Sequence, residues 1–128
     1  MVRVIIVDNE ETFRKGLKAV LMHIGNADVV AEAGNGIEFL ALLAHTSADV
    51  VFMDIKMPLM NGIEATRKAK QMYPDLSIFG FSSYENRDYI NSMLEAGACG
   101  YLSKSGDNYN LLSEILNNPK PGYFSGLK

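Results

Sequence analysis

The chain has 128 residues, of which 48% are hydrophobic and 21% are charged. These values suit one globular domain with a buried core and leave no room for a second folded domain. The formal net charge is −3 and no basic cluster is present, which disfavours sequence-independent binding to a nucleic-acid backbone. Any contact with DNA would therefore need another segment.

Two features of the sequence bear on cellular location. Cys99 is the only cysteine, so an intrachain disulfide and a cysteine-based metal cage are excluded, and we interpret it as a small core hydrophobe. The apolar start at residues 2–7 is too short for a signal peptide, and no apolar run approaches membrane-spanning length. The sequence predicts a cytoplasmic protein with no membrane partner.

Short apolar runs alternate with segments of helical periodicity along the whole chain. The predicted strands cover residues 2–7, 28–33, 50–53, 77–81 and 99–102. The predicted helices that follow them end near residues 24, 45, 73, 96 and 117, and the fifth is predicted to begin at Asp107. A strict alternation of strand and helix predicts an α/β fold with a doubly wound parallel sheet of five strands.

The sequence also indicates where helices begin or end and which of their residues face inward. Asn35 and Asn61 each precede a glutamate by three residues, the pattern of a capping box, and Gly97 is expected to end the fourth helix. Met72 is expected on the inward face of the third helix. Apolar steps of three and four predict an inward face for the first helix, formed by Phe13, Leu17, Val20, Leu21 and Ile24.

Polar side chains follow the ends of four predicted strands, namely Asp8, Asp54, Ser82 and Lys104. Each has a commoner structural role when taken alone: a helix cap, a turn former or a solvated lysine that adds little to stability. The carboxyl ends of parallel strands share one edge, however, so these four side chains should converge. Two carboxylates beside a hydroxyl and an ammonium suit Mg2+ and phosphoryl chemistry.

Two longer motifs carry a family resemblance. They are Asp-x-x-Met-Pro-x-Met-x-Gly, beginning at Asp54, and Gly-Ala-x-Gly-Tyr-Leu-x-Lys, ending at Lys104. With Val7-Asp8-Asn9-Glu10 and Phe81-Ser82-Ser83, they resemble the receiver domain of bacterial two-component response regulators over about residues 2 to 118. The resemblance implies a flavodoxin-like sheet in the order 2-1-3-4-5. We therefore expect a receiver domain at residues 1–118, and a tail or the start of a linker at 119–128.

The resemblance also implies roles for particular residues. Asp54 would accept a phosphoryl group from a sensor histidine kinase, in a domain that promotes its own phosphorylation and dephosphorylation without being an enzyme. Lys104 and Ser82 would bind the phosphoryl oxygens. Mg2+ or Mn2+ would be held by Asp8, Asn9, the Asp54 side chain and the backbone carbonyl of Lys56.

Switching and lifetime are implied in the same way. Tyr101 matches an aromatic residue that turns inward on phosphorylation and reshapes the surface of the fourth helix, fifth strand and fifth helix, through which the domain could also self-associate. A half-buried strand tyrosine is the plainer interpretation, and both can hold. Lys56 and Tyr84 match positions that border the path of the attacking water, where large side chains should slow dephosphorylation.

The sequence departs from the family at the metal site and leaves alternatives open. Asn9 stands where a second acid is usual, which puts metal affinity in question unless Glu10 compensates. A degenerate receiver that signals without phosphorylation is the first alternative. An aspartyl phosphatase of the haloacid dehalogenase type would need Asp-x-Asp after the first strand. A nucleotide or flavin binder would need a complete glycine fingerprint, and the sequence has neither motif.

One further motif points to a subgroup of the family. Phe13-Arg14-Lys15-Gly16-Leu17 and the tail at residues 122–125 resemble receivers joined to a C-terminal helix-turn-helix output domain. The chain is consistent with the N-terminal part of such a transcription regulator. DNA would then be bound only through a domain outside this chain.

Overall fold

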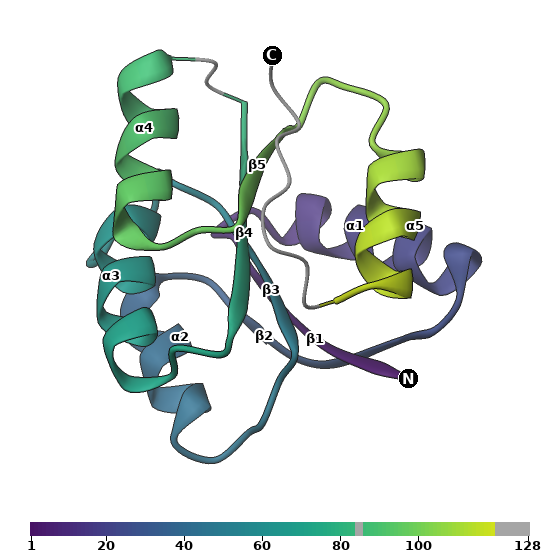
Figure 1. The fold of residues 1–128 in the computed structure, drawn as a ribbon, viewed down its shortest axis with the longest axis horizontal. Coiled ribbons are helices and arrows are strands. Elements are labelled where there is room, and N and C mark those ends of the chain that lie inside the picture. Colours follow the sequence, from purple (N-terminus) through teal and green to yellow (C-terminus); the bar gives the residue numbers. More distant parts are fainter. Residues whose placement is uncertain (84–85, 120–128) are drawn as a thin grey trace.

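The computed structural model describes residues 1–83 and 86–119. Its strands are β1 (Val2–Val7), β2 (Ala27–Ala33), β3 (Val50–Met53), β4 (Ser77–Ser82) and β5 (Gly100–Ser103). Its helices are α1 (Glu11–Ile24), α2 (Gly36–Leu43), α3 (Gly62–Met72), α4 (Arg87–Ala96) and α5 (Tyr109–Asn117). All strand pairs are parallel and the order is β2-β1-β3-β4-β5, which confirms the predicted topology (Figure 1).

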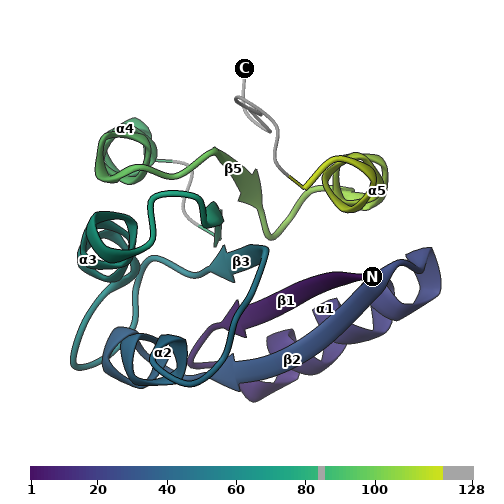
Figure 2. The same cartoon turned by 60° about the horizontal axis from the view of Figure 1, so that its bottom comes forward.

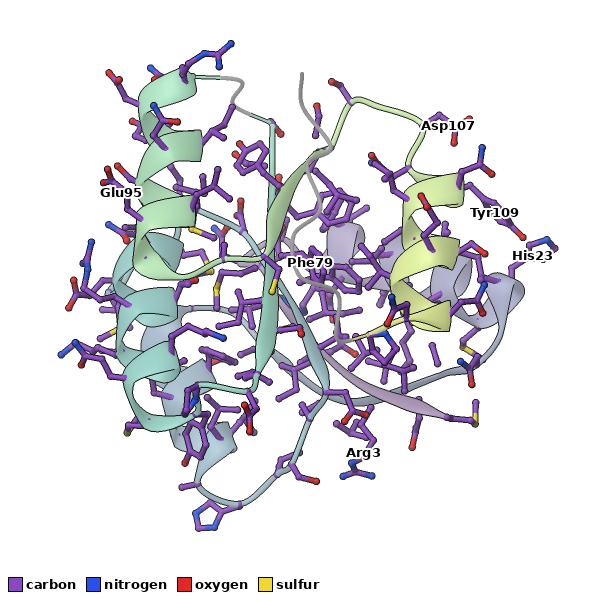
Figure 3. All side chains as sticks on the ribbon, in the orientation of Figure 1. Arg3, His23, Phe79, Glu95, Asp107 and Tyr109 are labelled. Atoms are coloured by element: carbon purple, nitrogen blue, oxygen red, sulfur yellow. The ribbon has the colours of Figure 1, made fainter. Side chains whose placement is uncertain are left out.

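The sheet is covered on both faces, as Figure 2 shows. Helices α2, α3 and α4 pack on one face over a core that includes Ile5, Val51 and Ile78. Helices α1 and α5 cover the other face, where Phe79 lies near the centre of the molecule (Figure 3). Because β3 is buried on both sides, its four residues are all apolar rather than alternating.

Helix boundaries follow local hydrogen bonding, with one difference from the predicted capping boxes. The Asn35 and Asn61 side chains accept the backbone N–H of Glu38 and of Glu64, each at 2.9 Å. The Glu38 carboxylate, however, accepts from the Gly34 N–H rather than from the cap residue, at 2.8 Å. The Glu64 carboxylate instead pairs with basic neighbours on α3. Each box is therefore only half formed.

Three details of burial and extent differ from the sequence predictions. Val20 and Met72, both expected inward, are 38% and 56% exposed, because the neighbouring elements cover narrower stripes of α1 and α3 than the apolar periodicity suggests. Cys99 is only half-buried and packs at the margin of the core. Helix α5 begins at Tyr109 rather than Asp107, whose carboxylate accepts the Tyr109 N–H. Within the described ranges, no helix is both long and apolar enough to cross a bilayer.

Candidate phosphorylation site

Strand register brings the predicted residues to one edge of the sheet. Val7 pairs with Met53, so Asp8 and Asp54 leave adjacent strands at the same level. Ser82 pairs with Ser103, and the Lys104 N–H donates to the Ser82 carbonyl at 2.9 Å. The site is thus assembled by the ladder of β1, β3, β4 and β5 rather than by flexible loops.

Lys104 is the electrostatic centre of this edge. Its Nζ lies 2.5 Å from Asp8 Oδ2 and 3.3 Å from Glu10 Oε1. The same nitrogen is 3.7 Å from Asp54 Oδ1. The Lys104 side chain is only 10% exposed, so the alternative of a solvated lysine does not apply. Burial alone would lower the pKa of this ammonium, but the close ion pair with Asp8 and the surrounding carboxylates outweigh it, so the pKa is raised.

Asp54 is buried, with 6% of its surface exposed, and its Oδ1 accepts the Ile55 N–H at 2.9 Å. Burial raises the pKa of this carboxyl from 3.8 to about 6, and the nearby charge of Asp8 acts in the same direction. The Lys104 ammonium and the Ile55 hydrogen bond oppose that rise. Additional positive charge at the edge would therefore favour the ionised, nucleophilic form of Asp54.

A polar cleft of about 300 Å³ opens beside Asp54 and is lined by Asn9, Glu10, Asp54, Lys56, Ser83 and Lys104. Ser82, predicted to contact a phosphoryl oxygen, is fully buried, whereas its exposed neighbour Ser83 lines the cleft. The sequence did not single out Ser83, although the two consecutive serines at the end of β4 were a signal that either could face the site.

Of the other predicted residues, Lys56 lines this cleft. Lys56 is exposed, and its Nζ lies 5.2 Å from the centroid of the Tyr89 ring. Tyr101 is 1% exposed, so its ring is turned inward and fully buried rather than half-buried. Its ring atoms approach within 3.0 Å of where a Cβ on Gly80 would stand, which explains the glycine in β4. Tyr84 lies outside the described residues.

The loop after β3 packs closely against the backbone of the proposed acceptor. The Gly62 N–H donates to the Ile55 carbonyl at 2.7 Å. A Cβ on Gly62 would lie 1.9 Å from the backbone oxygen of Asp54, so no other residue fits without moving this loop. Gly62 is also the last residue of the Asp-x-x-Met-Pro-x-Met-x-Gly motif that carries the family resemblance. Close packing against Asp54 is an additional reason for glycine here.

The donor chemistry of the edge fits a hard divalent cation. Asp8 Oδ2 is a buried oxygen that touches the Lys104 ammonium but has no aligned hydrogen bond. Across residues 1–83 and 86–119, no three His, Cys, Asp or Glu side chains lie close enough to hold a metal by themselves. An ion here would be completed by carbonyl oxygens and water, which is how Mg2+ is usually bound.

Comparison with known proteins identifies the family. A family profile described as the response regulator receiver domain matches residues 4–116. The chain therefore belongs to the response regulator receiver domains of two-component systems. Such domains take phosphate from sensor kinases and generally bind Mg2+ at the phosphorylation site, and they are generally signalling domains rather than enzymes.

The curated relatives are transcriptional regulators. The chain is 35% identical over 114 residues to the transcriptional regulatory protein DegU of Brevibacillus brevis, which covers 89% of this chain and 48% of that protein. It is 38% identical over 104 residues to the response regulator GacA of Pseudomonas viridiflava, covering 81% and 49%. The chain thus spans about half the length of the curated relatives it matches.

Solved structures place the fold among receivers of the LuxR and NarL type. A LuxR-family two-component response regulator from Aurantimonas sp. SI85-9A1 superposes with a TM-score of 0.88 at 30% identity, covering 98% of this chain and 89% of that one. The isolated receiver of RcsB from Salmonella enterica serovar Typhimurium, determined with the phosphomimetic BeF3−, gives a TM-score of 0.85 at 25% identity, covering 97% and 92%.

Proposed function

We propose that this domain receives a phosphoryl group on Asp54 from the phosphohistidine of a sensor kinase and switches a transcriptional output. The observation that carries the proposal is the setting of Asp54: a buried carboxylate that lines an open polar cleft, 3.7 Å from an ammonium. Asp8 does not line the cleft and is already paired with Lys104. Glu10 is 67% exposed and is paired with the same ammonium at 3.3 Å.

In the transfer step, an Asp54 carboxylate oxygen attacks phosphorus, the bond from phosphorus to the imidazole nitrogen breaks, and the electron pair remains on the histidine. Lys104 would neutralise charge on the phosphoryl oxygens, and Ser82 or its neighbour Ser83 would donate a hydroxyl hydrogen bond. Mg2+ or Mn2+, when bound by Asp8, Asn9, Asp54 and the Lys56 carbonyl, supplies further positive charge beside those oxygens.

The readout would use the surface of α4, β5 and α5. Tyr101 lies in β5, three residues before Lys104, so a change at the lysine would be transmitted through the strand that precedes it. We propose that this surface pairs two receivers or contacts the output segment. Residues 1–118 would form the receiver, and residues 119–128 would lead to a DNA-binding domain. Lys56, with Tyr84, would slow loss of the phosphoryl group by crowding the path of water.

A second candidate is a degenerate receiver that acts without phosphorylation. The specific observation in its favour is Asn9, an uncharged amide that lines the cleft where a second carboxylate would strengthen cation binding. The Glu10 carboxylate in the same cleft weighs against it, because it restores a negative charge beside the site.

Intact mass spectrometry after incubation with a small phosphodonor and Mg2+ separates the two candidates. We expect the wild-type chain to gain one phosphoryl group and Asp54→Asn to gain none. Asp75→Asn, an exposed aspartate in the loop between α3 and β4, is the matched control and should label like wild type. Absence of labelling in wild type with both Mg2+ and Mn2+ would favour the degenerate receiver. Labelling of Asp54→Asn would refute the acceptor assignment.

A further inference from the structure

The first turn of α1 carries two consecutive residues, Phe13 and Arg14, that contact Lys104 and Asp8 of the phosphorylation site. They belong to the Phe13-Arg14-Lys15-Gly16-Leu17 motif. Both side chains are partly buried, yet neither lines the cleft beside Asp54. Their contacts are to the groups that hold the site together.

Arg14 forms hydrogen bonds with the segment that follows β1. Its Nη1 donates to the Asp8 carbonyl at 2.5 Å, and its Nε donates to Glu32 of β2 at 3.0 Å. The Arg14 backbone N–H donates to the Glu10 carbonyl at 3.1 Å. With 18% of its side chain exposed, this guanidinium ties the loop that carries Asp8 to the neighbouring strand.

Phe13 contacts the lysine of the site. The Lys104 Nζ lies 4.2 Å from the centroid of the Phe13 ring, within the range of a cation–π interaction. That ring is in turn held edge-to-face against Phe81 of β4, with centroids 5.1 Å apart. The ammonium therefore contacts both an aromatic face and the Asp8 carboxylate.

We propose that Phe13 and Arg14 are positioning residues that fix the Asp8 carboxylate and the Lys104 ammonium relative to each other. Arg14 sets where the carboxylate is presented to a cation, and Phe13 sets where the ammonium is presented to the phosphoryl group. This inference rests on the proposed function of the site. Its two halves make different predictions, because one acts on cation binding and the other on the lysine.

The Arg14 half is tested by Mg2+ affinity, measured from chemical shifts during a titration. We expect Arg14→Ala to weaken Mg2+ binding by about tenfold, as for other residues that orient a metal ligand. Arg14→Lys keeps the charge but cannot bind the Asp8 carbonyl and the Glu32 carboxylate at once, so its loss of Mg2+ affinity should be intermediate. Arg67→Ala is the matched control, because Arg67 is an exposed partner of Glu64 on α3.

A merely structural role gives a different pattern. If Arg14 only joins α1 to β2, Arg14→Ala should lower the melting temperature while Mg2+ affinity stays within twofold of wild type, and that result would overturn this half. The titration needs no phosphorylation. A failure of the proposed function, seen as no labelling of the wild-type chain, is therefore distinguishable from a failure of this inference.

The Phe13 half is tested by pairing two substitutions. Phe13→Leu keeps an apolar side chain but removes the aromatic face, whereas Phe13→Tyr keeps the face. At saturating Mg2+ we expect Phe13→Leu to be phosphorylated by a small donor about three- to tenfold more slowly than wild type. Phe13→Tyr should be phosphorylated at the wild-type rate. Mg2+ affinity should be unchanged in both variants. Equal rates for Leu and wild type, or an equal loss for Leu and Tyr, would overturn this half.

Discussion

Replacing the proposed acceptor should stabilise the protein at neutral pH in the absence of metal. Asp54 is buried beside Asp8, and burial raises its pKa from 3.8 to about 6. The folded chain therefore binds this proton more tightly than the unfolded chain does. The contribution of this carboxyl to the free energy of unfolding is greatest at low pH and is lost as the pH rises through the interval between the two values.

The magnitude follows from that difference. One pKa unit corresponds to about 1.4 kcal/mol. The rise of the Asp54 pKa from 3.8 to about 6 therefore sets an upper bound of ~3 kcal/mol on the gain in the free energy of unfolding. Water in the adjoining cleft screens the charge, so we expect Asp54→Asn to raise the free energy of unfolding by about 1–2 kcal/mol at about pH 8. The amide oxygen still accepts the Ile55 N–H, so little is lost in return.

Urea unfolding in EDTA measures this effect directly. Wild type, Asp54→Asn and the control Asp75→Asn would be compared at about pH 8 and about pH 4.5. The advantage of Asp54→Asn should shrink at the lower pH, where the wild-type carboxyl is protonated in the folded state. A variant that is less stable than wild type at the higher pH, or an advantage independent of pH, would refute the reasoning.

Three further substitutions test other parts of the site. Lys104→Ala leaves its buried carboxylate partner unpaired and should lower the free energy of unfolding by about 2–3 kcal/mol in EDTA, with Mg2+ recovering part of the loss in a thermal melt. Asn9→Asp should tighten Mg2+ binding in a titration and lower the melting temperature in EDTA, and unchanged affinity would mean that Glu10 already supplies the charge. Gly62→Ala places a Cβ 1.9 Å from the acceptor's backbone oxygen and should cost about 1–3 kcal/mol in urea unfolding, whereas Gly16→Ala, with nothing within 4 Å, should be neutral or stabilising.

Much of the fold followed from local signals. Alternating apolar runs and helical periods predicted five parallel strands, whereas their order in the sheet came from the family resemblance. The asparagine caps predicted where α2 and α3 begin. The exposure of Val20 and Met72 could not be foreseen, because periodicity gives the direction of a helix face but not the width of the surface that covers it.

The site was predictable only as far as topology determines it. Parallel strands bring Asp8, Asp54 and Lys104 to one edge of the sheet regardless of loop conformation. In the structure, Lys104 contacts both carboxylates at that edge. Topology does not determine the direction of the side chains around that edge. That Ser83 rather than Ser82 lines the cleft, and that Phe13 stacks on the lysine, depends on rotamers and contacts that sequence spacing does not encode.

The central claim is that Asp54 itself carries the phosphoryl group. Borohydride reduces an acyl phosphate to an alcohol, so treatment of the phosphorylated protein converts the modified aspartate to homoserine. Mass spectrometric sequencing of two tryptic peptides then identifies the residue: the peptide that ends at Lys56 contains Asp54, and the peptide that ends at Arg14 contains Asp8 and Glu10. We predict homoserine at position 54 in protein treated with phosphodonor and Mg2+, and none without the donor. A reduced side chain at Asp8 or Glu10 instead of Asp54 would contradict the account.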